Sequence, residues 1–106
     1  MDVDVLEQLE NRADHVAGLL SLMGNSRRLL ILCRLAEGEA SVGALQAQIG
    51  LGQSALSQHL AKLRAAGVVA TRRDGQSVFY RIADDDVRAI MASLYDTFCR
   101  EARGDG

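Results

Sequence analysis

The stretch Gln53–Gly67 reads QSALSQHLAKLRAAG and is typical of an amphipathic helix that a glycine ends. Leu56, Leu60 and Leu63 recur at helical spacing, so we expect them to face the core. Polar side chains occupy the first two turns of the opposite face. Gly67 is well placed to end the helix in the left-handed conformation. The stretch therefore predicts a helix anchored by one face and free to offer polar groups from the other.

A shorter helix precedes this one. Ser41 is suited to cap a helix that runs to Ile49, because its side-chain oxygen can accept from a free backbone N–H. Gly50–Gly52 forms a tight connection between the two helices. Two helices joined by a short glycine-containing turn predict a helix-turn-helix over about residues 41–66.

The N-terminal third of the chain predicts two more helices. Apolar residues recur at helical spacing up to Met23, and Asp2 is suited to cap this first helix. Asn25 or Ser26 is expected to cap a second helix, which Gly38 ends.

After the helix-turn-helix the apolar period changes from helical to two-fold. Asp74–Gly75 is a strong hairpin signal, and Ser77–Ile82 forms the returning strand. Asp84 is suited to cap a last helix. The order of four helices, two strands and a fifth helix predicts a mainly α fold with a small β-hairpin, a winged helix-turn-helix. We expect one domain over residues 1–106, with the wing at about 68–82.

The distribution of charge points to nucleic acid more than the formal net charge of −2 does. Residues 41–83 contain five basic residues and one acid, a local charge of +4, whereas residues 1–40 and 84–106 each carry −3. A solvated face is the plainer interpretation of any single charge cluster. A basic middle in an acidic chain is nevertheless the asymmetry that steers a protein onto phosphate.

The polar face of the Gln53–Gly67 helix suits a DNA major groove, which admits one helix and is read by side chains near its N-terminus. Glutamine pairs with adenine, serine contacts base or phosphate, and Lys and Arg neutralise phosphates. The residues expected to contact DNA are Gln53, Ser54, Ser57, Gln58, His59, Lys62, Arg64, Arg72, Arg73 and Gln76. His59 keeps two interpretations, a phosphate contact or a packed helix residue. A winged helix used only for protein contact is the alternative, which the basic middle disfavours.

Other features of the chain exclude several classes of protein. No apolar run approaches the roughly 18 residues of a membrane span, and the acidic N-terminus is unlike a signal peptide. We therefore expect a cytoplasmic protein with reduced thiols. There is no Ser-His-Asp set, Cys-x-x-Cys motif or nucleotide-binding loop, so neither an enzyme nor a cofactor is expected. A domain of 106 residues would bury more surface as a dimer.

From about Leu20 to Cys99 the chain resembles the ArsR/SmtB family of winged-helix repressors. The stretches that carry the resemblance are NSRRLLIL at 25–32, SALSQHLAKLRAAGVV at 54–69 and RRDGQSVFYRI at 72–82. The resemblance implies a homodimer formed through the first and last helices, at about 1–23 and 84–103. It also implies binding to an inverted-repeat operator in double-stranded DNA until an inducer arrives.

Many members of that family sense metals, but the matching positions here lack the ligands. One family site needs a Cys-Val-Cys segment, where this chain has Ser41-Val42-Gly43. The other needs histidines on the last helix, and the two histidines of the chain are His15 and His59. The acids at 84–86 are expected to cap that helix and complement its dipole. No metal site is therefore expected.

Cys33 and Cys99 lie on apolar helix stripes, and on that ground alone each reads as a small buried hydrophobe. Their placement, however, resembles the sulfide- and persulfide-sensing BigR/SqrR-like subgroup, which includes HlyU-like proteins. Those proteins carry one cysteine in an Ile-Leu-Cys segment and another near the end of the last helix. The resemblance implies that reactive sulfur species join the two thiols in an intrasubunit di- or polysulfide bridge that releases the operator.

The same two cysteines would also serve a second kind of thiol chemistry. A general sensor of peroxide or hypochlorite would use the same two cysteines, and the atoms added to the protein would distinguish the two chemistries. A reactive cysteine also needs a lowered pKa, for which Arg34 and Arg100 are the candidate neighbours.

Overall fold

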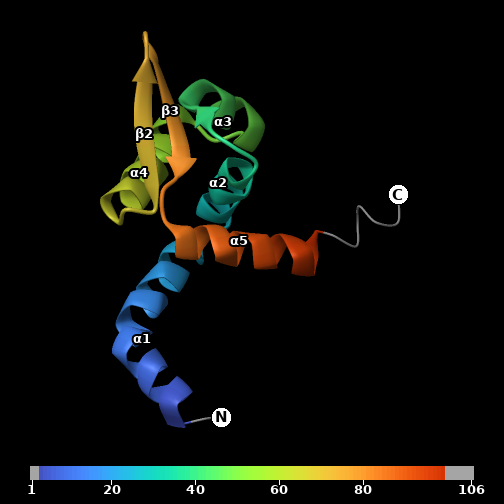
Figure 1. Cartoon of the computed structure of the whole chain (residues 1–106). Helices are drawn as coiled ribbons and strands as arrows, with labels where there is room; N and C mark the ends of the chain where they lie inside the picture. Colours follow the sequence, from blue (N-terminus) through green and yellow to red (C-terminus); the bar gives the residue numbers. More distant parts are fainter. Residues whose placement is uncertain (1–2, 100–106) are drawn as a thin grey trace.

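Five helices and three short strands make up the part of the chain that the structure, a computed structural model, describes, residues 3–99 (Figure 1). The elements are α1 (Val3–Met23), α2 (Ser26–Ala36), β1 (Ala40–Ser41), α3 (Val42–Ile49), α4 (Gln53–Ala65), β2 (Val69–Asp74), β3 (Ser77–Ile82) and α5 (Asp85–Phe98). The winged helix-turn-helix arrangement is as the sequence predicts.

Side-chain caps set the beginning of three helices. Asn25 Oδ1 accepts from the backbone N–H groups of Arg27 and Arg28 at 3.0 and 3.2 Å, so Asn25 rather than Ser26 caps α2. Ser41 Oγ accepts from the N–H of Ala44 at 3.1 Å and begins α3. Asp84 likewise caps α5, accepting from Val87 at 2.9 Å. Each cap satisfies backbone donors that have no partner within the helix. The proposed cap Asp2 lies outside the described residues.

The sheet has one strand more than the sequence predicts. Its order is β1-β3-β2, with both pairs antiparallel, and β1 places Ala40 opposite Tyr80 and Ser41 opposite Phe79. A strand of two residues is too short to show two-fold alternation, which is why the expected two-stranded hairpin is corrected here to a three-stranded sheet.

The turn of the wing also lies one residue further along than expected. Asp74 pairs with Ser77, so the two loop residues are Gly75 and Gln76 rather than Asp74 and Gly75. Gly75 has a φ of +63°, and no residue other than glycine has a positive φ in the described part of the chain. Glycine at the first loop position is the pattern of a two-residue II′ turn, which matches the twist of the strands.

One hydrophobic core joins the helix-turn-helix to the sheet and to α5. Leu56, Leu60 and Leu63 of α4 are all buried, as their spacing predicts. The core also contains Leu19, Met23, Ile31, Leu32, Leu35, Ala40, Leu45, Val68, Val69, Ile82, Val87 and Met91. α1 buries only its C-terminal end, and in Figure 1 the rest of it projects away from the body.

Among residues 3–99, no single helix is long and apolar enough to cross a membrane. α1 and α2 meet the criteria of length and composition only when they are taken together, as a pair bent by 97°.

Candidate functional site

The polar face of α4 points away from the core. Gln53, Ser54, Ser57 and Gln58 are exposed on its first two turns, and the leucines behind them fix the orientation of the helix. Lys62 and Arg64 are exposed on the later turns of the same helix. The arrangement leaves the polar groups available to a partner that approaches from solvent.

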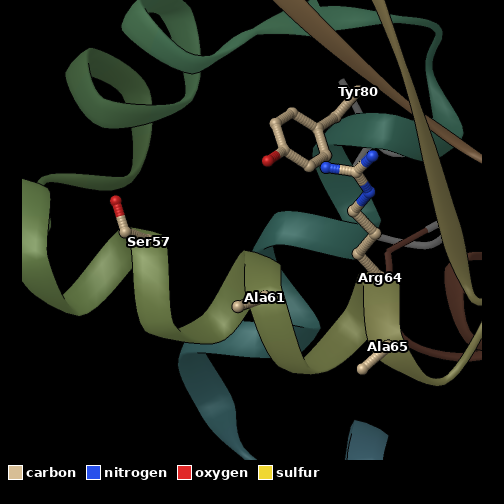
Figure 2. Close-up of a pocket in the computed structure, with 5 residues that line it drawn as sticks. All are labelled: Ser57, Ala61, Arg64, Ala65 and Tyr80. Atoms are coloured by element: carbon tan, nitrogen blue, oxygen red, sulfur yellow. The ribbon is translucent and has the colours of Figure 1, made fainter.

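An open groove of 490 Å³ runs between α4 and the wing strand β3. Its lining is Ser57, Ala61, Arg64, Ala65 and Tyr80, shown in Figure 2. The four α4 residues follow helical spacing and therefore share one face. Tyr80 is absent from the sequence-based set of contact residues, because only the packing of the strand beside the helix brings it there.

The two neighbouring wing arginines have different surroundings. Arg72 donates from Nε and Nη2 to the two carboxylate oxygens of Glu39, each at 2.7 Å, and its guanidinium lies 4.6 Å from the ring centroid of Phe79. The hydrogen bond from Arg72 lowers the pKa of Glu39 and raises that of Arg72. Arg73 and Gln76 are exposed, and within residues 3–99 neither side chain has a hydrogen-bond or ion-pair partner.

His59 is half-buried on the flank of α4. Burial lowers the pKa of His59, and the positive charges of Arg28 and Lys62 lower it further. Arg28 also donates from Nε to the carbonyl of Leu22 at 2.6 Å, which holds it at the end of α1. The imidazole is therefore mainly neutral at neutral pH, and the neighbouring lysine and arginines carry the positive charge.

Cys33 on α2 and Cys99 at the end of α5 line one groove of 700 Å³. Both thiols are exposed and free. The other residues that line this thiol groove are Ala36, Glu37, Arg88, Met91, Ala92, Tyr95 and Asp96. Two cysteines separated by most of the sequence thus open into the same space.

The surroundings of Cys33 in the thiol groove disfavour its thiolate form. Partial burial raises the pKa of the Cys33 thiol, and the neighbouring Cys99 and Glu37 raise it further. Arg34 points elsewhere, with Nε donating to Gln48 Oε1 at 2.7 Å and Nη1 to the carbonyl of Gly38 at 3.2 Å. The expectation that Arg34 lowers this pKa is therefore wrong, because adjacent helical side chains point in different directions. Arg100 lies outside the described residues.

Arg88 connects the thiol groove to the wing. It lines the groove, and its Nη2 donates to the carbonyl of Ile82 at 2.6 Å. Ile82 is the last residue of β3 and belongs to the core. Arg88 thus links the first turn of α5, where it lines the thiol groove, to the end of the wing.

Residues at or near the positions where other family members bind metals form caps and surface contacts in this structure. Ser41 caps α3, and Asp84 caps α5. His15 Nε2 lies 4.0 Å from Asp86 Oδ2 on the surface between α1 and α5. In the part of the chain that is described, no three His, Cys, Asp or Glu side chains gather in a way that could hold a metal ion.

Large apolar side chains remain exposed on the two helices expected to form a dimer interface. On α1 they are Val5, Leu6, Leu9 and Leu20, and on α5 they are Tyr95 and Phe98. Phe98 is 74% exposed although it continues the stripe that Val87 and Met91 bury. Val5, Leu6 and Leu9 lie close together on α1, and exposed apolar side chains grouped in this way are typical of a surface that a partner covers.

Comparisons with known proteins agree with this fold. The model of the family described as "Bacterial regulatory protein, arsR family" matches residues 25–71. A biofilm growth-associated repressor of Xylella fastidiosa is 43% identical over 97 residues, which cover 92% of this chain and 85% of that protein. The transcriptional activator HlyU of Vibrio cholerae is 44% identical over 95 residues, covering 90% of this chain and 88% of that one.

Solved structures of such proteins superpose closely. Reduced HlyU from Vibrio cholerae has a TM-score of 0.83 at 44% identity, covering 88% of this chain and 98% of that chain. The transcriptional repressor BigR from Xylella fastidiosa also has a TM-score of 0.83, at 45% identity, covering 88% and 95%. These relatives are regulators of transcription rather than enzymes.

Proposed function

Because the chain belongs to the arsR family of bacterial regulatory proteins, we propose that it is a homodimeric repressor whose two cysteines sense reactive sulfur species. Membership makes the chain a DNA-binding transcriptional regulator, and BigR and HlyU among its relatives place it in the BigR/HlyU group. The sensing proposal is carried by one observation, the single groove that both Cys33 and Cys99 line.

This regulator acts by binding DNA through α4 and the wing. Gln53, Ser54, Ser57 and Gln58 meet base edges and phosphates in the major groove, while Lys62, Arg64 and Arg73 neutralise phosphates. The exposure of these side chains and the local charge of +4 support the proposal. His59 contributes packing, and Arg72 positions the wing through Glu39.

A homodimer formed through α1 and α5 would present two copies of α4, one from each subunit, to an inverted-repeat operator. The two halves of such an operator are related by the same symmetry as the two subunits. The exposed apolar residues on these helices, Leu6 and Phe98 among them, support this interface.

The sulfur chemistry needs only the two thiols and a persulfide donor, R–S–SH. One cysteine thiolate attacks the outer sulfur of the donor, whose S–S bond breaks, so that a cysteine persulfide forms and R–SH leaves with the proton. The second thiolate then displaces hydrosulfide from that persulfide and leaves a disulfide. If both cysteines carry an added sulfur, the same displacement leaves a trisulfide and also releases hydrosulfide. The donor sulfur is reduced to sulfide while the two thiols are oxidised.

A bridge between α2 and α5 would release DNA by changing how the two α4 helices and wings of the dimer are placed relative to each other. Cys99 ends α5, so closing a bridge to Cys33 pulls on a helix that also carries the dimer interface and Arg88. A conformational cost of about 2–3 kcal/mol to the DNA complex corresponds to roughly 30- to 150-fold weaker binding.

Mass spectrometry combined with DNA binding tests the sensing proposal. Reduced protein is treated with a glutathione persulfide donor or with hydrogen peroxide, and each sample is divided between intact-mass measurement and a gel shift on upstream DNA. We expect the donor to join Cys33 to Cys99, with the mass of one or more added sulfur atoms in part of the protein, and to release DNA. Cys33→Ser and Cys99→Ser should bind DNA and should stay bound when the donor is added. A reductant should restore DNA binding by the donor-treated wild-type protein.

The possible results separate the two thiol chemistries. Release of DNA by peroxide alone, with only the loss of two hydrogens, would favour a general oxidant sensor. Normal release by either serine variant would overturn the pair mechanism, while the DNA-binding function would stand.

A further inference from the structure

We propose that the groove between α4 and β3 binds one phosphodiester of the DNA strand that separates the major groove from the neighbouring minor groove. The inference rests on the proposed DNA-binding function and deepens it. It gives Tyr80 a direct contact with DNA, and it gives Ala61 a steric role.

The position of the groove follows from how a winged helix would lie on a duplex. With α4 in the major groove, the β2–β3 hairpin reaches toward the neighbouring minor groove, and a sugar–phosphate backbone forms the wall between these two grooves. A backbone that runs between the helix and the hairpin would pass over the space that Ser57, Arg64 and Tyr80 line. The space is open and measures 490 Å³, which is ample for a phosphate and its sugar.

Three polar groups converge on this space. Figure 2 shows the hydroxyl of Ser57, the guanidinium of Arg64 and the ring of Tyr80 on the same side of α4. None of the side-chain hydrogen bonds or ion pairs formed within residues 3–99 uses these three groups. Hydroxyl and guanidinium groups are donors that match the oxygens of a phosphate.

The residues between these donors have small side chains, which leave the groove open. Ala61 lies one helical turn from both Ser57 and Arg64, Ala65 lies one turn beyond Ala61, and all four residues line the groove. A methyl group at position 61 lets a backbone approach the helix closely, whereas a longer side chain would fill the space.

A phosphate within a duplex suits this groove better than a free anion does. One arginine and two hydroxyls in an open groove would hold free phosphate weakly, because water competes at such an exposed site. A duplex already held by α4 and the wing presents a phosphate there at a high effective concentration. The local charge of +4 over residues 41–83 favours the same polyanion.

Phosphate ethylation interference tests the contact one position at a time. The probe is a duplex selected from a randomised library by the wild-type protein and then ethylated at single phosphates. We expect one phosphate in each half-site whose ethylation weakens wild-type binding about tenfold. Arg64→Gln should weaken binding to the unmodified duplex about tenfold, and Tyr80→Phe about threefold, and both should lose sensitivity at that phosphate.

Ala61→Leu and Ala47→Leu form a matched pair for the steric part of the proposal. The leucine at position 61 should weaken binding and abolish the sensitivity of the same phosphate, whereas the same change at exposed Ala47 on α3, outside the groove lining, should behave as wild type. Circular dichroism and thermal melting identify any variant that fails to fold, and if Arg64→Gln fails to fold, Tyr80→Phe and Ala61→Leu carry the test. An unchanged interference pattern in folded Tyr80→Phe and Ala61→Leu would overturn the inference. Failure of the wild-type protein to bind any duplex would overturn the DNA-binding function itself.

Discussion

Arg72 and Glu39 are joined by two hydrogen bonds of 2.7 Å, although they are 33 residues apart in the chain. The pair ties the middle of β2 to the segment that leads from α2 into β1. Arg73, the next residue, has no such partner within residues 3–99. Two adjacent arginines that look alike in the sequence therefore have distinct surroundings.

Replacement of each arginine by alanine should separate their roles. Arg73→Ala should weaken DNA binding and reduce the slope of log Kd against log salt by about 1, because one phosphate contact is lost. Arg72→Ala should change this slope less but lower the melting temperature, because its carboxylate partner is left without the arginine. Fluorescence anisotropy over a salt series measures the slope. Equal slope changes in the two variants would contradict the division of roles.

The rate at which the thiols react should rise with pH and depend on Glu37. Because the pKa of Cys33 is raised by burial, by Cys99 and by Glu37, its thiol is mostly protonated at neutral pH. Below that pKa the thiolate fraction, and with it the rate of bridge formation, should grow about tenfold per pH unit if Cys33 is the attacking thiol. Glu37→Gln removes one negative charge and should speed the reaction about two- to threefold at pH 7.

Quenched-flow trapping of free thiols at several pH values measures these rates. Glu10→Gln, an equal charge change on exposed α1, serves as the control and should leave the rate unchanged. A slower reaction in Glu37→Gln would show that the carboxylate assists the thiol rather than opposing its ionisation.

Charge introduced on the exposed apolar faces should dissociate the proposed dimer. Leu6→Glu or Phe98→Glu is expected to raise the dimer dissociation constant about 10- to 100-fold, because a carboxylate replaces a side chain that association would bury. Sedimentation velocity over a concentration series measures the change. Ala47→Glu on α3 adds the same charge outside both faces and should leave the dimer intact. Identical behaviour of all three variants would argue against α1 and α5 as the interface.

Arg88 should transmit the state of the thiols to DNA without taking part in their chemistry. In Arg88→Gln we expect the Cys33–Cys99 bridge to form in normal yield, but the loss of DNA affinity that follows it should be at least about threefold smaller. Intact mass reports the bridge, and anisotropy reports the affinity. Arg27→Gln, an exposed change on α2, is the control. A wild-type response in Arg88→Gln would exclude this route.

Features determined by neighbouring residues were predictable from the sequence. The helix starts at Asn25, Ser41 and Asp84 depend on a side chain and the next few backbone groups, and the burial of the α4 leucines depends on helical periodicity. The helix-turn-helix and the wing followed from these local signals.

Features determined by distant residues were not predictable in this way. β1 exists because β3 lies beside it, the pairing of Arg72 with Glu39 depends on that sheet, and the orientation of Arg34 depends on Gln48 across a helix boundary. The shared groove of Cys33 and Cys99 was implied only by resemblance, since no periodicity relates residues that far apart.

The two-residue strand β1 has a consequence for the order in which the molecule is completed during synthesis. Ala40 and Ser41 find their partners only in Tyr80 and Phe79, about 40 residues later in the chain. α2, α3 and α4 therefore leave the ribosome before their sheet can close, and the buried Ala40 stays open to solvent until the hairpin emerges. A chain that has emerged from the ribosome only as far as residues 66–77 would hold a complete α4 without the sheet that later packs beside it.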